Sequence, residues 1–348
     1  MDENFRYKTN NFSLHFVLRQ IESGRMEVDP DFKDLKARTA RDKSLFIESL
    51  ILGIPTQPIW CEETPSGDYI VIEGAERLTT LVDFFREKFP LSSLKIRKEY
   101  TGLYFHELPY HEKISLEDRY QFTFIIINYD TLPQLKCEFF RRLLNDTGNS
   151  SDQSARNFAW PRSFEYLQEI KSSCEDLINF APRDSRWRLN FRSEKPKVRS
   201  EIDEVFLYLL MIFVVLSGDV NEDAYLDETM SVDDLLDWTM NYFDMVGVRR
   251  FEAKHRVHWA LMQMAQQLGQ PPRVLLSNTI RTHYVDGDDL ALPEFYLLFV
   301  RAFSNKIIME IDWKKVRAQR FVSSSSAKNL ISYIFQARND QLPNHKKY

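Results

Sequence analysis

Two carboxylates and one arginine surround a single glycine in the first quarter of the chain. The run Glu-Gly-Ala-Glu-Arg places Glu73, Gly74, Glu76 and Arg77 within five residues. Carboxylate oxygens are ligands that Mg²⁺ accepts, and a planar guanidinium can hold a phosphate through two parallel hydrogen bonds. One hypothesis is therefore a phosphate site, in which Glu73 and Glu76 hold a divalent cation and Arg77 contacts the phosphate. The alternative is a group of charges that face water.

The hydrophobic pattern predicts the strand and the helix that would hold these residues. Residues 69–72 form a short apolar, β-rich run, which is typical of a buried strand. Glycine tolerates positive φ, so Gly74 can end that strand sharply. From Glu76 onward, apolar residues recur on one helical face, which predicts a helix over residues 77–89. Its first N–H groups would attract anions, because they lack partners inside the helix.

A second apolar helix and a hairpin are expected upstream of this junction. Residues 45–52 predict a helix that Ser44 would cap. Residues 58–62 and 69–72 predict two strands joined by a turn. Downstream of the junction, residues 122–129 predict a further buried strand. Glu48 lies in the apolar helix, where it is either an ordinary surface charge or a residue that faces the candidate site.

Taken in order, these pieces resemble the N-terminal domain of GmrS-like proteins, from the GmrSD type of modification-dependent restriction system. That family has Pro-x-Phe-Gln-Arg, then Leu-Ile-Glu-Ser-Ile-Leu-Leu-Gly-Ile-Pro, then a strand and Asp-Gly-Gln-Gln-Arg-Leu-Thr-Thr. The matching pieces are Pro30-Asp31-Phe32, residues 46–55 and residues 73–80. The resemblance covers about the first 130 residues. It implies a ParB/sulfiredoxin-like fold, a bacterial or phage-related setting, and nucleotide binding and hydrolysis, sometimes with nicking of DNA.

Most polar residues of the family's motifs are different here. The Gln-Arg after Phe32 is Lys33-Asp34, and only Gly74 and Arg77 of the Asp-Gly-Gln-Gln-Arg motif are identical. The lost arginine and amides are groups that bind phosphate, and the added carboxylates repel it. We therefore expect a degenerate GmrS-like subunit of an antiphage defence or restriction system, which binds nucleotide or DNA and acts with a partner protein.

Two other functions stay open. One is an active metal-dependent NTPase or nuclease with an altered site. The resemblance then implies that Glu73, Glu76 and Arg77 are catalytic and that Gly74 and Arg77 contact a nucleoside triphosphate with Mg²⁺. The other is a protein-binding scaffold. The family's nuclease partner carries a His-Ile-x-Pro type motif, which is missing from the second half of this chain. The expected partner is therefore a paralogue with an intact motif or a separate nuclease subunit.

A further family element, Glu-Leu-Arg-Asn, has a counterpart without its glutamate at residues 155–157. The resemblance implies that Arg156 and Asn157, like Glu48, reach the nucleotide. The alternative is ordinary helix capping and a surface arginine.

Basic residues are concentrated in the segment 183–199 of an otherwise acidic chain. The chain has 46 basic and 51 acidic residues, a net charge of −5, so overall charge does not favour nucleic acid. In this segment Trp187 and Phe191 lie between cations, and such a mixture can neutralise phosphates and stack on bases. We expect it to bind DNA, with an interdomain linker as the alternative. Its cations are Arg183, Arg186, Arg188, Arg192, Lys195, Lys197 and Arg199.

The composition restricts the class of protein. Hydrophobic residues make up 43%, a globular value. The three cysteines are far apart, so neither a disulfide framework nor a metal site is expected. The N-terminus lacks a signal-peptide pattern, and the longest apolar run, residues 205–216, is too short to span a membrane. These features predict a cytoplasmic protein without a membrane partner.

The length of 348 residues suggests two domains. We expect an α+β chain with a ParB/sulfiredoxin-like GmrS-type domain at 1–160 and a helical domain at 161–348. Helical periodicity in the second domain covers residues 164–177, 201–216, 232–245, 252–268, 292–304 and 327–337.

Overall fold

The protein is described by a computed structural model, which covers residues 4–30, 38–145, 152–181, 196–217, 231–275 and 289–304. Within these ranges helices and strands are mixed, and the chain divides into two compact units, residues 1–136 and 137–348. The division falls earlier than the boundary expected at residue 160. Helix α6 (Asp152–Ala159) packs against the helices of the second unit, which explains the difference.

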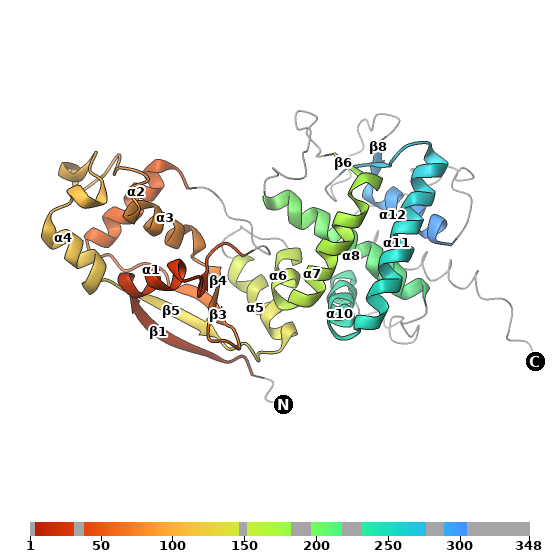
Figure 1. The fold of residues 1–348 in the computed structure, drawn as a ribbon, viewed down its shortest axis with the longest axis horizontal. Coiled ribbons are helices and arrows are strands. Elements are labelled where there is room, and N and C mark those ends of the chain that lie inside the picture. Colours follow the sequence, from red (N-terminus) through yellow and green to blue (C-terminus); the bar gives the residue numbers. More distant parts are fainter. Residues whose placement is uncertain are drawn as a thin grey trace, which may run out of the picture. The chain divides into compact units, whose positions relative to one another are not determined.

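The first unit is built on a five-stranded mixed sheet in the order β1-β5-β3-β4-β2 (Figure 1). Neighbours β1–β5 and β3–β4 are antiparallel, whereas β3–β5 and β2–β4 are parallel. The β3–β4 hairpin and the strand β5 lie where the apolar runs predicted strands. The strands are β1 (Tyr7–Ser13), β2 (Met26–Glu27), β3 (Ile59–Glu63), β4 (Tyr69–Glu73) and β5 (Gln121–Ile127).

Three helices pack on one face of this sheet (Figure 1). They are α1 (Leu14–Glu22), α2 (Ala40–Ile51) and α3 (Ala75–Phe85), and the short helix α4 (Tyr110–Ile114) precedes β5. Leu50 of α2 and Leu78 of α3 are at most 2% exposed in the shared core. Burial of such a side chain contributes about 1.5 to 3 kcal/mol, so the core fixes the start of α3 at the end of β4.

Helix α2 begins earlier than its apolar pattern predicted. Its cap is Thr39, whose hydroxyl accepts the N–H of Asp42 at 3.2 Å. Ser44, the expected cap, lies inside the helix, where its hydroxyl donates to the carbonyl of Ala40 at 2.8 Å. The prediction was wrong because the first turn of α2 is polar and does not contribute to the hydrophobic periodicity.

The second unit is mainly helical, and the helices that begin at Pro161, Pro196, Val232, Gly247 and Leu292 overlap the predicted periodic segments. They are α5 (Pro133–Asn145), α6, α7 (Pro161–Cys174), α8 (Pro196–Leu216), α10 (Val232–Met245), α11 (Gly247–Leu268) and α12 (Leu292–Phe303). The apolar run in α8 is buried against α7, α10 and α11. The helix expected at 327–337 lies outside the described residues.

A small parallel sheet in the second unit was not predicted. Its strands are β6 (Asn179–Ala181), β7 (Arg273–Leu275) and β8 (Asp289–Ala291), in the order β6-β7-β8. Strands of three residues are too short to produce a detectable alternation. In the part of the chain that the structure describes, no helix combines the length and apolarity that a membrane crossing requires.

Candidate functional site

The strand-to-helix junction at Gly74 has the predicted geometry. β4 ends at Glu73, Gly74 has φ 98° and ψ 5°, and α3 begins at Ala75. A Cβ on Gly74 would lie 2.4 Å from Cδ1 of Ile59 and 2.9 Å from Nη2 of Arg77. Glycine is therefore required for two reasons. The backbone at this position is left-handed, and the neighbouring side chains leave no room for a Cβ.

Arg77 is buried beneath this turn. Its Nη1 donates to the carbonyl of Gln57, and its Nη2 donates to the carbonyl of Pro58 at 2.9 Å. The residue is 7% exposed, and burial lowers the pKa of its guanidinium although Glu73 opposes the change. These two hydrogen bonds therefore link the segment before β3 to the start of α3.

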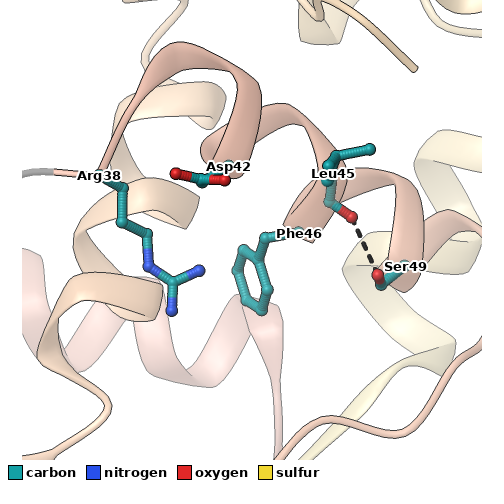
Figure 2. A pocket seen from close by; sticks show the side chains of 5 residues that line it. All are labelled: Arg38, Asp42, Leu45, Phe46 and Ser49. Atoms are coloured by element: carbon teal, nitrogen blue, oxygen red, sulfur yellow. Dashed lines mark hydrogen bonds between the residues drawn. The ribbon is translucent and has the colours of Figure 1, made fainter. Parts of the chain in front are cut away.

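A shallow hollow of about 450 Å³ lies on the outer side of α2 (Figure 2). It is lined by Arg38, Asp42, Leu45, Phe46 and Ser49. Figure 2 shows the guanidinium of Arg38 beside the ring of Phe46, with Cζ 5.5 Å from the ring centroid. Asp42, Leu45 and Ser49 lie on the exposed or half-buried side of α2, whereas Phe46 belongs to the core. The sequence identified none of the lining residues as candidates, because the helix was recognised from its buried side.

Glu73 and Glu76, the expected catalytic carboxylates, are half-buried at the same junction. Oε2 of Glu76 lies 3.9 Å from Nε of Arg38, which connects the carboxylate to the hollow. Among the described residues, no group of three or more His, Cys, Asp or Glu side chains is arranged to hold a metal ion. The two carboxylates would therefore have to hold Mg²⁺ without a third such ligand from these residues.

Glu48 is 4% exposed and accepts hydrogen bonds from three consecutive main-chain N–H groups. Its Oε1 accepts from Ile96 at 2.7 Å and Arg97 at 2.8 Å, and its Oε2 accepts from Lys95 at 3.1 Å. Burial by itself raises the pKa of Glu48, but these N–H groups outweigh burial and the pKa is lowered. The carboxylate thus holds the loop at residues 95–97 in place.

Replacing Glu48 with glutamine is expected to lower the free energy of unfolding by about 1 to 3 kcal/mol at pH 7, since charged hydrogen bonds are lost. The folded-state pKa of Glu48 is lowered, so its contribution is complete above the ordinary glutamate pKa and is lost as pH falls through the folded-state value. The difference between wild type and Glu48→Gln should therefore shrink below about pH 4. Urea unfolding at pH 7 and below about pH 4 measures this difference. Glu22→Gln, which changes an exposed glutamate, is the control. A difference that does not depend on pH would contradict this role.

Arg156 and Asn157 lie in the second unit, on α6. Nε of Arg156 donates to Asp237 at 2.8 Å and Nη2 to Asp233 at 2.6 Å, while Nδ2 of Asn157 donates to Asp203 at 3.0 Å. The side chain of Arg156 is fully buried; burial lowers its pKa, but Asp237 more than offsets burial and the pKa is raised. Both residues thus join helices of their own unit.

The cationic segment is largely outside the described residues. Arg183, Arg186, Arg188, Arg192 and Lys195 lie there, and Lys197 and Arg199 occupy the first turn of α8, where only the backbone is described. DNA binding by residues 183–199 remains a prediction from sequence.

The comparisons with known proteins give no relative. No protein-family model, curated protein or solved structure matches the chain.

Proposed function

We propose that this chain is a non-hydrolytic, GmrS-like subunit of a bacterial antiphage defence or restriction system, which binds nucleotide or DNA and acts with a partner protein. In this proposal its first unit is a ParB/sulfiredoxin-like domain. The observation that carries the proposal is the position of Arg77. Its guanidinium is buried and donates to the carbonyls of Gln57 and Pro58. An arginine held in this way is not available to stabilise the negative charge that develops on a transferred phosphoryl group.

The charges near the hollow favour the same reading. Asp42 lines the hollow, and Glu76 stands 3.9 Å from Arg38, whose guanidinium also lies over Phe46. A triphosphate carries several negative charges, so nearby carboxylates disfavour it unless a cation lies between them. The family's scaffold is retained in this proposal, and its phosphoryl chemistry is lost.

Purified full-length protein is expected to release no phosphate above background from GTP, ATP or CTP, with or without Mg²⁺ or Mn²⁺. Loss of one preorganised donor costs roughly 3 to 4 kcal/mol of barrier, and several donors differ here from the family. A variant with Lys33→Gln, Asp34→Arg, Glu73→Asp, Ala75→Gln and Glu76→Gln restores the family's residues, and turnover in this variant alone would favour the proposal. Metal-dependent turnover by wild type that disappears in Glu73→Gln would overturn it.

Binding is tested with a duplex oligonucleotide and the same protein. If residues 183–199 neutralise phosphates, the logarithm of affinity should fall with the logarithm of salt concentration by about 0.9 for each phosphate contacted. The triple variant Arg186→Ala, Arg188→Ala, Arg192→Ala should flatten that slope. Lys8→Ala, which removes a cation from the first unit, is the control and should leave the slope unchanged. An identical slope in wild type and triple variant counts against this segment as the DNA site.

A further inference from the structure

The sheet of the first unit ends in a long strand whose outer edge faces no other strand among the described residues. β1 is the last strand in the order β1-β5-β3-β4-β2, and Figure 1 shows it as the outermost one. The strand at the other end, β2, has only two residues. A seven-residue edge such as that of β1 presents a row of N–H and C=O groups to any strand that approaches it.

The pairing of β1 with β5 determines which backbone groups point outward. The N–H of Asn128 donates to the carbonyl of Arg6 at 3.2 Å, and the register continues without a shift along β1. In an antiparallel pair, residues alternate between hydrogen-bonded and non-hydrogen-bonded positions. Even-numbered residues of β1 therefore bond to β5. The N–H and C=O groups of three odd-numbered residues, Tyr7, Thr9 and Asn11, point to the open edge, and so does the N–H of Ser13. The carbonyl of Ser13 instead accepts the first hydrogen bond within α1, because Ser13 is the N-cap of that helix.

β1 lacks the features that usually protect an edge from pairing. It contains no proline and no bulge, and Tyr7, Thr9 and Asn11 are exposed. A lysine can block edge pairing through its charge. Lys8 is the only charged residue of β1, but its Nζ lies 2.6 Å from Oε2 of Glu63, so its charge is balanced within the unit.

We propose that β1 pairs with β1 of a second copy of this chain, antiparallel and centred on Asn10, so that the two sheets become continuous. Since the outward groups belong to odd-numbered residues, the register centred on Asn10 is the one in which all four residues take part, Ser13 through its N–H alone. It places Tyr7 opposite Ser13 and Thr9 opposite Asn11 of the second copy. Lys8 then faces Phe12 rather than another Lys8, so no like charges meet across the strands.

The proposal is tested first by sedimentation of the full-length protein over a wide concentration range. A reversible monomer–dimer equilibrium is expected. Thr9→Pro removes an outward N–H from each copy and leaves the bonds to β5 intact. The dissociation constant of the dimer should therefore rise on the order of tenfold or more. Thr9→Val keeps the N–H and should dimerise as wild type does. A wild-type monomer at every concentration, or equal dimerisation by Thr9→Pro, would overturn the proposal.

A pair of charge variants tests the register and the identity of the occupant. Thr9→Lys with Asn11→Lys, and Thr9→Glu with Asn11→Glu, each place like charges opposite each other in the proposed dimer and should be monomeric. Mixed in equal amounts, the two variants should form a heterodimer whose affinity falls with salt. No heterodimer in the mixture rejects this register. If wild type is monomeric and Thr9→Pro instead loses capture of an added extended peptide, the edge receives a foreign strand and not a second copy.

Discussion

Replacing Gly74 with alanine is expected to destabilise the first unit by about 2 to 4 kcal/mol. The residue has φ 98°, which an alanine adopts only with strain. Its Cβ would also stand 2.4 Å from Cδ1 of Ile59, inside van der Waals contact. Relief requires the end of the Ile59 side chain and the guanidinium of Arg77 to shift, and both of these side chains are buried. Hydrogen exchange of the amides in β3, β4 and α3 measures the loss for this unit alone.

Gly67 provides the matched control for this prediction. It has φ 81°, but a Cβ there would meet no heavy atom within 4 Å. Gly67→Ala should therefore carry only the backbone cost, about 1 kcal/mol. Equal losses for the two substitutions would mean that the close approach of Ile59 and Arg77 to Gly74 contributes nothing.

Asp237→Ala is expected to destabilise the second unit by about 3 to 5 kcal/mol. Asp237 accepts two hydrogen bonds from Arg141, at 2.7 and 2.8 Å, and one from Arg156 at 2.8 Å. The side chain of Arg156 is fully buried and cannot turn to water when its partner is removed. Removing the carboxylate therefore leaves a buried cation with much less compensation. Hydrogen exchange in α5, α6 and α10 reports the loss.

Asp233 supplies the control in the same helix. It also accepts a hydrogen bond from Arg156, at 2.6 Å, but its side chain is 63% exposed. Water can replace much of the interaction between Asp233 and Arg156. Asp233→Ala should therefore lower the free energy of unfolding by less than about 1 kcal/mol. If the two variants lose the same stability, Arg156 depends on the exposed carboxylate of Asp233 as much as on the half-buried carboxylate of Asp237, and the account of this network is wrong.

The sequence by itself determined the elements whose signals are local. The β3–β4 hairpin, the strand β5 and the helix α10 follow from apolar periodicity that a single segment contains. Gly74 was identified as the turn residue because the ability to adopt a positive φ depends on the residue type at that one position. The mixture of helices and strands was predicted on the same basis and is confirmed. The early start of α2 and the strands β6, β7 and β8 were missed, because a polar first turn and three-residue strands carry little periodic signal.

Only the tertiary structure decided what the charged candidates do. Arg77 was expected to contact a nucleotide, and Glu48 and Arg156 were left open between reaching it and an ordinary structural role. In the structure each is bound to groups far away in the sequence. Arg77 donates to carbonyls at positions 57 and 58, Glu48 accepts N–H groups from residues 95–97, and Arg156 bonds to carboxylates of α10. A guanidinium binds a phosphate, a carbonyl or a carboxylate with the same hydrogen bonds, so residue type and spacing leave its partner undefined. The partner is fixed by the packing of segments that the sequence keeps far apart.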